Sequence, residues 1–102
     1  MPTYEEALLY LGIDYADDVV RRNLTRALAA ARTTLHGSLG ADVDELMSDD
    51  PRVKELALIY TDDLYTNRGV SAKVSNATRL SVVSMELQLR MELRQLRKGA
   101  SV

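Results

Sequence analysis

Apolar residues recur at helical spacing over most of this chain, which predicts amphipathic helices. The first is short and follows Thr3, whose spacing to Glu6 is that of a capping box. The second carries one continuous apolar stripe and reaches Gly37, a residue type that commonly ends a helix. The third opens on Asp50 and Pro51, which suit the N-cap and the first helical position. The expected helices are residues 4–11, 16–36 and 51–67.

These segments predict an all-α fold, a small helical bundle with long antiparallel helices. Residues 37–50 combine glycine, serine and acidic residues, so we expect a long loop there, with one helical turn at 43–47. The chain has 102 residues, 46% of them hydrophobic and 27% charged, as expected for one globular domain. It contains no cysteine, which excludes a disulfide, a cysteine nucleophile and a cysteine metal ligand.

The last quarter of the chain has two competing hydrophobic periods. One set of apolar residues at helical spacing is Val82, Met85, Leu89, Leu93 and Leu96, and a second is Leu80, Val83, Leu87 and Met91. Residues 85–93 also alternate strictly between apolar and polar, as a half-buried strand does. We expect a helix over about 76–84 that gives way to an extended tail, with a continuous helix as the alternative. The expected division is a helical bundle domain at 1–84 and a C-terminal tail at 85–102.

Charge is unevenly distributed along the chain. Residues 1–63 hold 13 acidic residues against 6 Lys or Arg, whereas residues 64–102 hold 2 against 7. Such asymmetry indicates a surface that contacts a partner. Head-to-tail complementarity between identical subunits is the alternative interpretation.

No group of residues predicts catalysis, a cofactor or a metal site. His36 is the only histidine and lies in the last turn of an expected helix, so we interpret it as a structural or surface residue. The acidic residues between 42 and 50 lack the spacing of a calcium-binding loop, and no glycine-rich phosphate loop is present. No apolar run approaches the roughly 20 residues of a membrane span, and the acidic start of the chain is unlike a secretory signal. We expect a protein that is not an enzyme and has no membrane partner.

Several landmarks occur together along the chain. They are Leu-Gly-Ile-Asp at 11–14, Asp-Pro-Arg at 50–52, Leu-Tyr-Thr-Asn-Arg-Gly at 64–69, Gln-Leu-Arg at 88–90 and Gln-Leu-Arg-Lys-Gly at 95–99. In their order and spacing the chain resembles the head–tail connector (adaptor) proteins of tailed bacteriophages, a family also described as DNA-packaging proteins. The residues that carry the family pattern are Leu11, Ile13, Asp14, Tyr65, Asn67 and Arg68.

The resemblance implies a structural protein of the virion. About twelve copies of such a protein form a closed ring beneath the portal protein, at the head–tail interface. The ring extends the channel through which genomic DNA passes without sequence-specific binding, and it joins the capsid to the head-closure (stopper) or tail proteins. The implied locations are the virion and, during assembly, the host cytoplasm.

The resemblance also implies that the C-terminal tail reaches the portal protein. We expect Leu80 and Val83 to face the bundle, and the tail after Ser84 to dock on the portal, where its alternation would suit addition to a sheet edge. The predicted interface residues are Met85, Leu87, Leu89, Arg90, Met91, Leu93, Arg94, Leu96 and Arg97.

A second function class stays open. Arg90, Arg94 and Arg97 would share one side of a helix with Lys98 nearby, and such a cluster could bind phosphates. The alternative is therefore a small phage or bacterial nucleic-acid-binding regulator that uses its basic C-terminus. The absence of aromatic residues among these cations weakens that interpretation.

Overall fold

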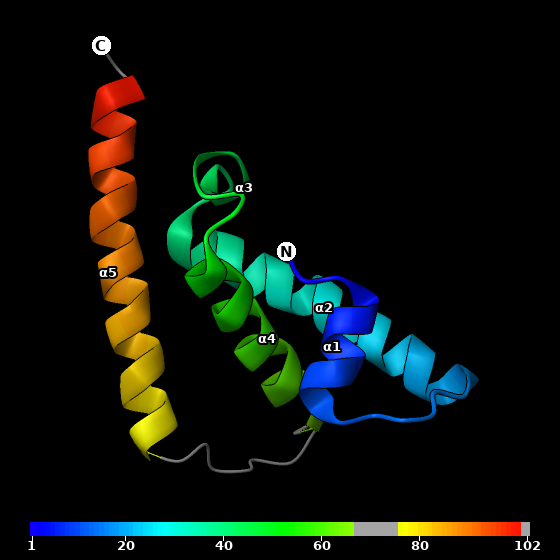
Figure 1. Ribbon diagram of the computed structural model, residues 1–102. Coiled ribbons are helices and arrows are strands. Elements are labelled where there is room, and N and C mark those ends of the chain that lie inside the picture. Colours follow the sequence, from blue (N-terminus) through cyan, green and yellow to red (C-terminus); the bar gives the residue numbers. More distant parts are fainter. Residues whose placement is uncertain (67–75, 101–102) are drawn as a thin grey trace.

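The computed structural model describes residues 1–66 and 76–100, and the side chains of residues 76–79 and 100 lie outside the description. The described residues form helices and no strand, which confirms the predicted all-α helical bundle (Figure 1). The helices are α1 (Tyr4–Leu11), α2 (Asp18–Leu39), α3 (Val43–Leu46), α4 (Pro51–Thr66) and α5 (Asn76–Ala100).

The caps expected at Thr3 and Asp50 are confirmed by their hydrogen bonds, whereas the second helix begins at Asp18, two residues later than predicted. In the capping box of α1, Thr3 Oγ1 accepts from the backbone N–H of Glu6 at 3.1 Å, and Glu6 Oε1 accepts from that of Thr3 at 3.0 Å. Asp17 Oδ1 accepts from the third residue of α2 at 2.8 Å. Asp50 Oδ1 accepts from the backbone N–H of Arg52 at 2.9 Å, at the start of α4. Each side chain satisfies an N–H that has no partner within its helix.

The predicted end of the second helix is wrong. α2 continues through Gly37 and ends at Leu39, and Gly40 adopts φ 101° as its cap. Leu35 and Leu39 lie four residues apart and are both buried, so one more helical turn places a second leucine in the core. The apolar surface buried by that turn outweighs the helix propensity of one glycine, about 1 kcal/mol.

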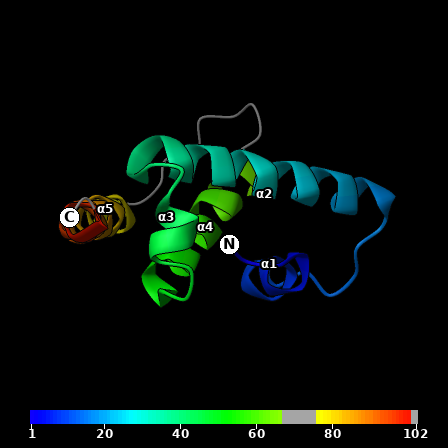
Figure 2. The ribbon, with the colours of Figure 1, turned by 90° about the horizontal axis from the view of Figure 1, so that it is seen from above.

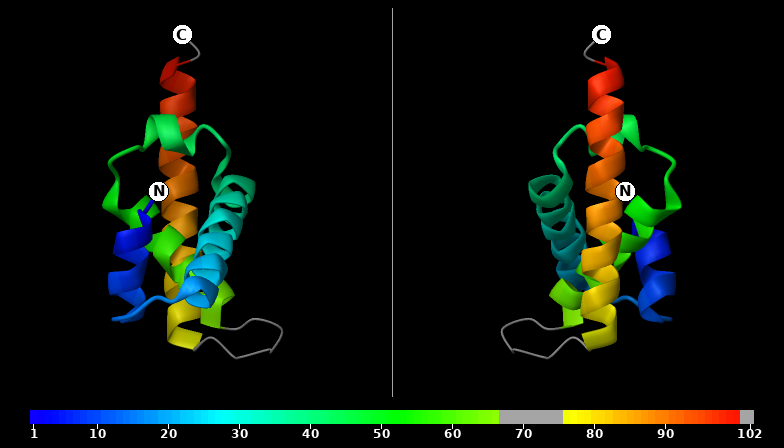
Figure 3. Two further views of the ribbon diagram at one scale, coloured as in Figure 1. Left: turned by 90° about the vertical axis from the view of Figure 1, so that its right-hand side faces the viewer. Right: turned by 90° about the vertical axis from the view of Figure 1, so that its left-hand side faces the viewer.

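The helices α2 and α4 form the centre of the molecule, which measures 49 × 27 × 20 Å. They run in roughly opposite directions, as predicted for the two long helices (Figure 1). α1 packs on the first half of α2, whereas α5 packs on its last turns, so that α1 and α5 lie toward opposite ends of the bundle (Figure 2). α5 extends past α3 at its C-terminal end (Figure 3).

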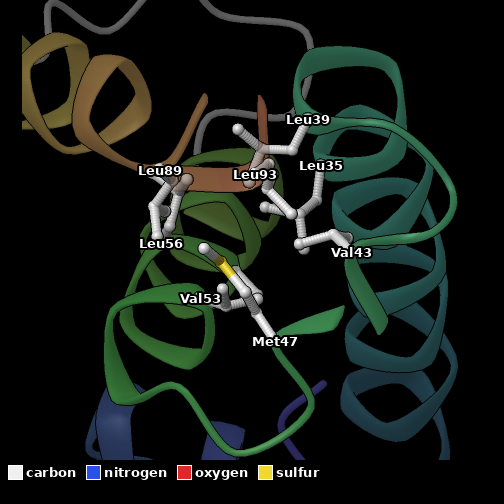
Figure 4. Close-up of a cluster of buried hydrophobic side chains, with 9 residues drawn as sticks. Leu35, Leu39, Val43, Met47, Val53, Leu56, Leu89 and Leu93 are labelled. Carbon is white, nitrogen blue, oxygen red and sulfur yellow. The ribbon is translucent and has the colours of Figure 1, made fainter. Parts of the chain in front are cut away.

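The described core consists of two clusters. The smaller, beneath α1, is built from Ala7, Leu24 and Leu58. The larger joins the end of α2, α3, α4 and α5, and Figure 4 shows Leu89 beside Leu56, and Leu93 directed toward Leu39. Its buried members are Leu35, Leu39, Val43, Met47, Val53, Leu56, Ala57, Leu89 and Leu93.

The expected extended tail is wrong, because α5 is one helix that passes through residue 85 without a break. Helical spacing places Leu89 and Leu93 on one line, and both side chains are 0% exposed in the larger cluster. A strand over the same residues would put Leu87 and Met91 on that face as well, whereas both are more than half exposed. Described residues on both sides of position 85 therefore share one core.

Candidate interaction surface

Two opposite faces of α5 are apolar, and one of them is buried against the described part of the bundle. The inner face consists of Val82, Met85, Leu89 and Leu93, all buried or partly buried in the larger cluster. A helix advances 100° per residue at 3.6 residues per turn, so Leu80, Val83, Leu87 and Met91 lie about opposite these residues. The pattern that seemed contradictory in the sequence is thus a single helix with two apolar stripes.

We call the second stripe the outer strip, defined as Leu80, Val83, Leu87 and Met91. These side chains are 69%, 57%, 55% and 60% exposed. The expectation that Leu80 and Val83 are buried against the bundle is wrong, because both side chains are more than half exposed. Contiguous exposed aliphatic side chains of this kind are typical of a surface that binds another protein.

The structure divides the nine residues predicted as a partner interface. Leu89 and Leu93 are corrected to core residues, because the protein's own helices cover them completely. Met85 is partly buried against the same cluster. Leu87 and Met91 stay exposed on the outer strip, and Leu96 is 42% exposed near the end of α5.

Two of the predicted interface arginines attach α5 to the bundle. Arg90 donates from Nε to the carbonyl oxygen of Ser38 at 3.1 Å and from Nη2 to its hydroxyl at 2.8 Å. Arg97 donates to both carboxylate oxygens of Asp42, at 2.8 and 2.6 Å, and to the Leu39 carbonyl oxygen at 2.6 Å. These hydrogen bonds span more than fifty residues of sequence, so no local pattern could have predicted them.

Arg97 crosses the turn between α2 and α3 at close range. A Cβ atom on Gly40 would lie 2.5 Å from Arg97 Nη2, and the positive φ of Gly40 disfavours any other residue. The hydrogen bond from Arg97 lowers the pKa of Asp42 below its usual value. The backbone of the turn therefore favours glycine here, and the absence of a side chain leaves room for the guanidinium.

A second arginine contact ties the middle of α5 to the start of α4. Arg52 donates to Asp50 at 2.7 Å and to Glu92 Oε1 at 2.9 Å, which forms a three-residue ionic cluster. The guanidinium lowers the pKa of both carboxyl groups below their usual values. Closer to the N-terminus of α5, Glu86 accepts a hydrogen bond from the hydroxyl of Tyr60 on α4. Burial of the Tyr60 side chain raises its pKa above the usual value, and this hydrogen bond raises it further.

We expect the free energy of unfolding to fall as the pH is lowered below about 4. Asp42, Asp50 and Glu92 have lower pKa values in the folded protein, so their ion pairs contribute fully above the unfolded pKa values. That contribution is lost as the pH falls through the lower folded values. Urea unfolding at a series of pH values should show the decline.

The variant Arg52→Gln removes the guanidinium from the carboxyl groups of Asp50 and Glu92. Its free energy of unfolding should therefore fall less steeply with decreasing pH than that of the wild type. Arg22→Gln, at an exposed arginine of α2, is the matched control and should leave the decline unchanged. Equal slopes for wild type and Arg52→Gln would contradict the role given to this cluster.

His36 has the structural role predicted for it. Its Nε2 lies 2.7 Å from Asp44 Oδ2, and Arg32 donates to the same oxygen at 3.3 Å. Burial opposes ionisation of Asp44, but these hydrogen bonds outweigh it and hold its pKa below the usual value. His36 therefore helps to fix α3 against α2.

The basic residues at the end of α5 border a surface groove of about 510 Å³. As predicted, the cations lie together on one side of the helix. Arg94 and Lys98 are exposed, whereas Arg90 and Arg97 are held by the contacts described above. The lining residues are Ser38, Leu39, Arg90, Arg94, Arg97 and Lys98.

A second exposed region lies at the turn from α1 into α2. We call residues 14–19 the acidic corner. Tyr15 is 80% exposed and Val19 is 60% exposed, and Asp14, Asp17 and Asp18 beside them are exposed as well. Apolar side chains with an acidic rim thus occur at the end of the molecule far from α5 (Figures 1 and 2).

The residues of the family pattern have mixed surroundings. Leu11, Ile13 and Tyr65 pack against the smaller cluster, which gives them a role in the fold. Asp14 is exposed in the acidic corner. Asn67 and Arg68 lie outside the described residues.

Comparisons with protein-family models, with curated proteins and with solved structures find no match to this chain. The resemblance to connector proteins therefore depends on the sequence landmarks alone. Within residues 1–66 and 76–100, no group of three or more histidine or acidic side chains is placed to hold a metal ion. No helix in the same ranges combines the length and apolarity that crossing a membrane requires.

Proposed function

We propose that this protein is a structural component of a tailed-phage virion, a head–tail connector whose copies form a ring beneath the portal protein. The ring would extend the DNA channel and join the capsid to head-closure or tail proteins. The observation that carries the proposal is the outer strip of α5, four aliphatic side chains each more than half exposed on a helix whose other face is in the core. The sequence landmarks supply the family.

The size and charge of the chain agree with an assembly role. A domain of 102 residues buries a limited fraction of its surface, so contacts with other subunits add to its stability. Its first 63 residues are strongly acidic, and a surface of that sign repels DNA phosphates. DNA can therefore pass such a surface without adhering to it.

Fewer residues of α5 can contact the portal protein than the sequence predicts. Leu89 and Leu93 belong to the core, so the portal contact is assigned to the exposed residues near the end of α5. These include Leu96, which is 42% exposed, and this end of the helix extends past α3 (Figure 3).

Electron microscopy of particles that contain the chain tests this proposal. A label at the N-terminus should appear at one vertex, as a ring between capsid and tail. The variant Leu96→Glu should fold normally and be missing from that vertex, whereas Arg22→Glu on α2 should be incorporated. Particles with a complete head–tail junction that lacks the protein would contradict the proposal.

The basic groove favours one other function, a nucleic-acid-binding regulator. Such a protein would bind duplex DNA, with an affinity that falls steeply as salt rises. Replacing Arg94 and Lys98 by glutamine would then weaken binding and reduce the salt dependence. A connector should show no such affinity at low salt, so one binding measurement separates the two functions.

A further inference from the structure

We propose that the outer strip of α5 is covered by the acidic corner of a second copy of this chain, in a head-to-tail contact. The inference rests on the proposed function and deepens it, because it names the two surfaces through which neighbouring subunits would meet.

The two surfaces lie at opposite ends of the molecule. α5 forms one end, and the start of α2, which carries the acidic corner, forms the other (Figures 1 and 2). In a dimer joined by this contact, one outer strip and one acidic corner remain free. Further copies can therefore bind, and a ring forms when the rotation between neighbours closes.

Both surfaces offer apolar side chains. The outer strip runs from Leu80 to Met91, a length of about 16 Å at the helical rise. The acidic corner offers Tyr15 and Val19, and Leu9 on the preceding helix is 82% exposed. Large apolar side chains at this exposure, gathered at two places on a small protein, favour burial in a contact.

The charges at the two surfaces are opposite in sign. Arg94 and Lys98 follow Met91 at spacings of three and four residues, so they continue the line of the outer strip. Asp14, Asp17 and Asp18 accompany the apolar residues of the acidic corner. Contact between the surfaces would place these acids within reach of the cations, and complementary charge of this kind sets the orientation of a docked pair.

Pairing of α5 with a second α5 would lack this complementarity. The described part of α5 contains two acids, Glu86 and Glu92. Glu86 accepts from Tyr60, and Glu92 is bound by Arg52. A symmetric pair of helices would therefore bring together two cationic ends without free carboxylates to balance them.

Two variants that each damage one surface provide the test. Leu87→Glu places an acid in the outer strip, where it would face the neighbour's acidic corner. Tyr15→Arg places a cation in the corner, where it would face the neighbour's cations. Both side chains are exposed, so both variants should fold, and circular dichroism verifies this. Thr25→Glu, at an exposed position of α2 outside both surfaces, is the matched control.

Sedimentation velocity should show that wild type and Thr25→Glu associate beyond dimers at up to about 1 mM protein. Each damaged variant alone should associate at least about tenfold more weakly. An equimolar mixture of the two should form at least a dimer, because Tyr15→Arg retains an intact strip and Leu87→Glu retains an intact corner.

Three results would overturn the inference: a wild type that stays monomeric, a mixture that forms no dimer, or a Tyr15→Arg variant that associates as strongly as the wild type. The last would indicate pairing of α5 with α5. Failure here is distinguishable from failure of the proposed function. A ring at the capsid vertex without this pairing would retain the connector function, whereas a heterodimer without such a ring would retain only the contact.

Discussion

Replacing Leu93 by alanine should lower the free energy of unfolding by about 2–5 kcal/mol. The side chain is 0% exposed and lies in the larger cluster, directed toward Leu39 (Figure 4). Alanine there removes buried methyl groups and leaves a cavity that the four contributing helices can fill only in part. Leu89→Ala should have a similar effect, because Leu89 is equally buried beside Leu56.

The matched control is Met91→Ala on the outer strip. Met91 lies on the same helix but is 60% exposed, so its replacement should change the free energy of unfolding by less than about 0.5 kcal/mol. Urea denaturation with a common slope for all variants gives the comparison. Equal effects at Leu93 and Met91 would mean that neither face of α5 is packed in solution, as the extended tail would require.

A chain that ends at Ser84 should lose its cooperative unfolding transition. The deletion removes Leu89 and Leu93, and with them the surface that covers the end of α2 and the first half of α4. Two buried leucines at about 2–5 kcal/mol each approach the total stability of a small domain, about 5–15 kcal/mol. The contacts of Arg90, Glu92 and Arg97 with the bundle are lost as well.

Circular dichroism and urea titration measure this result. A chain that ends at Lys98 is the control, because it retains both leucines and Arg97 and should unfold cooperatively. If the chain ending at Ser84 kept a sharp transition at wild-type denaturant concentration, residues 1–84 would be an independent domain, and the shared core would be wrong.

The residues that would carry function could be predicted only in part. The sequence placed a partner surface between residues 85 and 97, and exposed residues of that segment, Leu87 and Met91, lie on the outer strip. It assigned Leu89 and Leu93 to the same surface because the alternating and the helical period both include them. Leu80 and Val83 were missed as exposed residues, although the second helical period already grouped them with Leu87.

The acidic corner had a sequence signal that was interpreted locally. Aspartates are typical of a helix start, and Asp17 caps α2. That interpretation leaves unexplained the exposure of Tyr15 and Val19 beside them, which depends on how far α1 extends over α2. An apolar residue shows its exposure only when the neighbouring elements are placed.

The sequence alone determined the helical class of the fold and the caps that begin α1 and α4. Capping is local chemistry, in which Thr3, Asp17 and Asp50 each accept from a backbone N–H two or three residues away. Such signals can be recognised without knowledge of the remaining chain.

Tertiary structure decided where α2 ends, which period α5 follows and which of its two stripes is buried. Those outcomes depend on surfaces distant in sequence: the cluster that receives Leu93, and the carboxylate of Asp42 that receives Arg97. A helix with two apolar stripes can bury only one against a bundle on one side. Packing therefore left the outer strip exposed, and this exposed stripe is the basis of the proposed assembly.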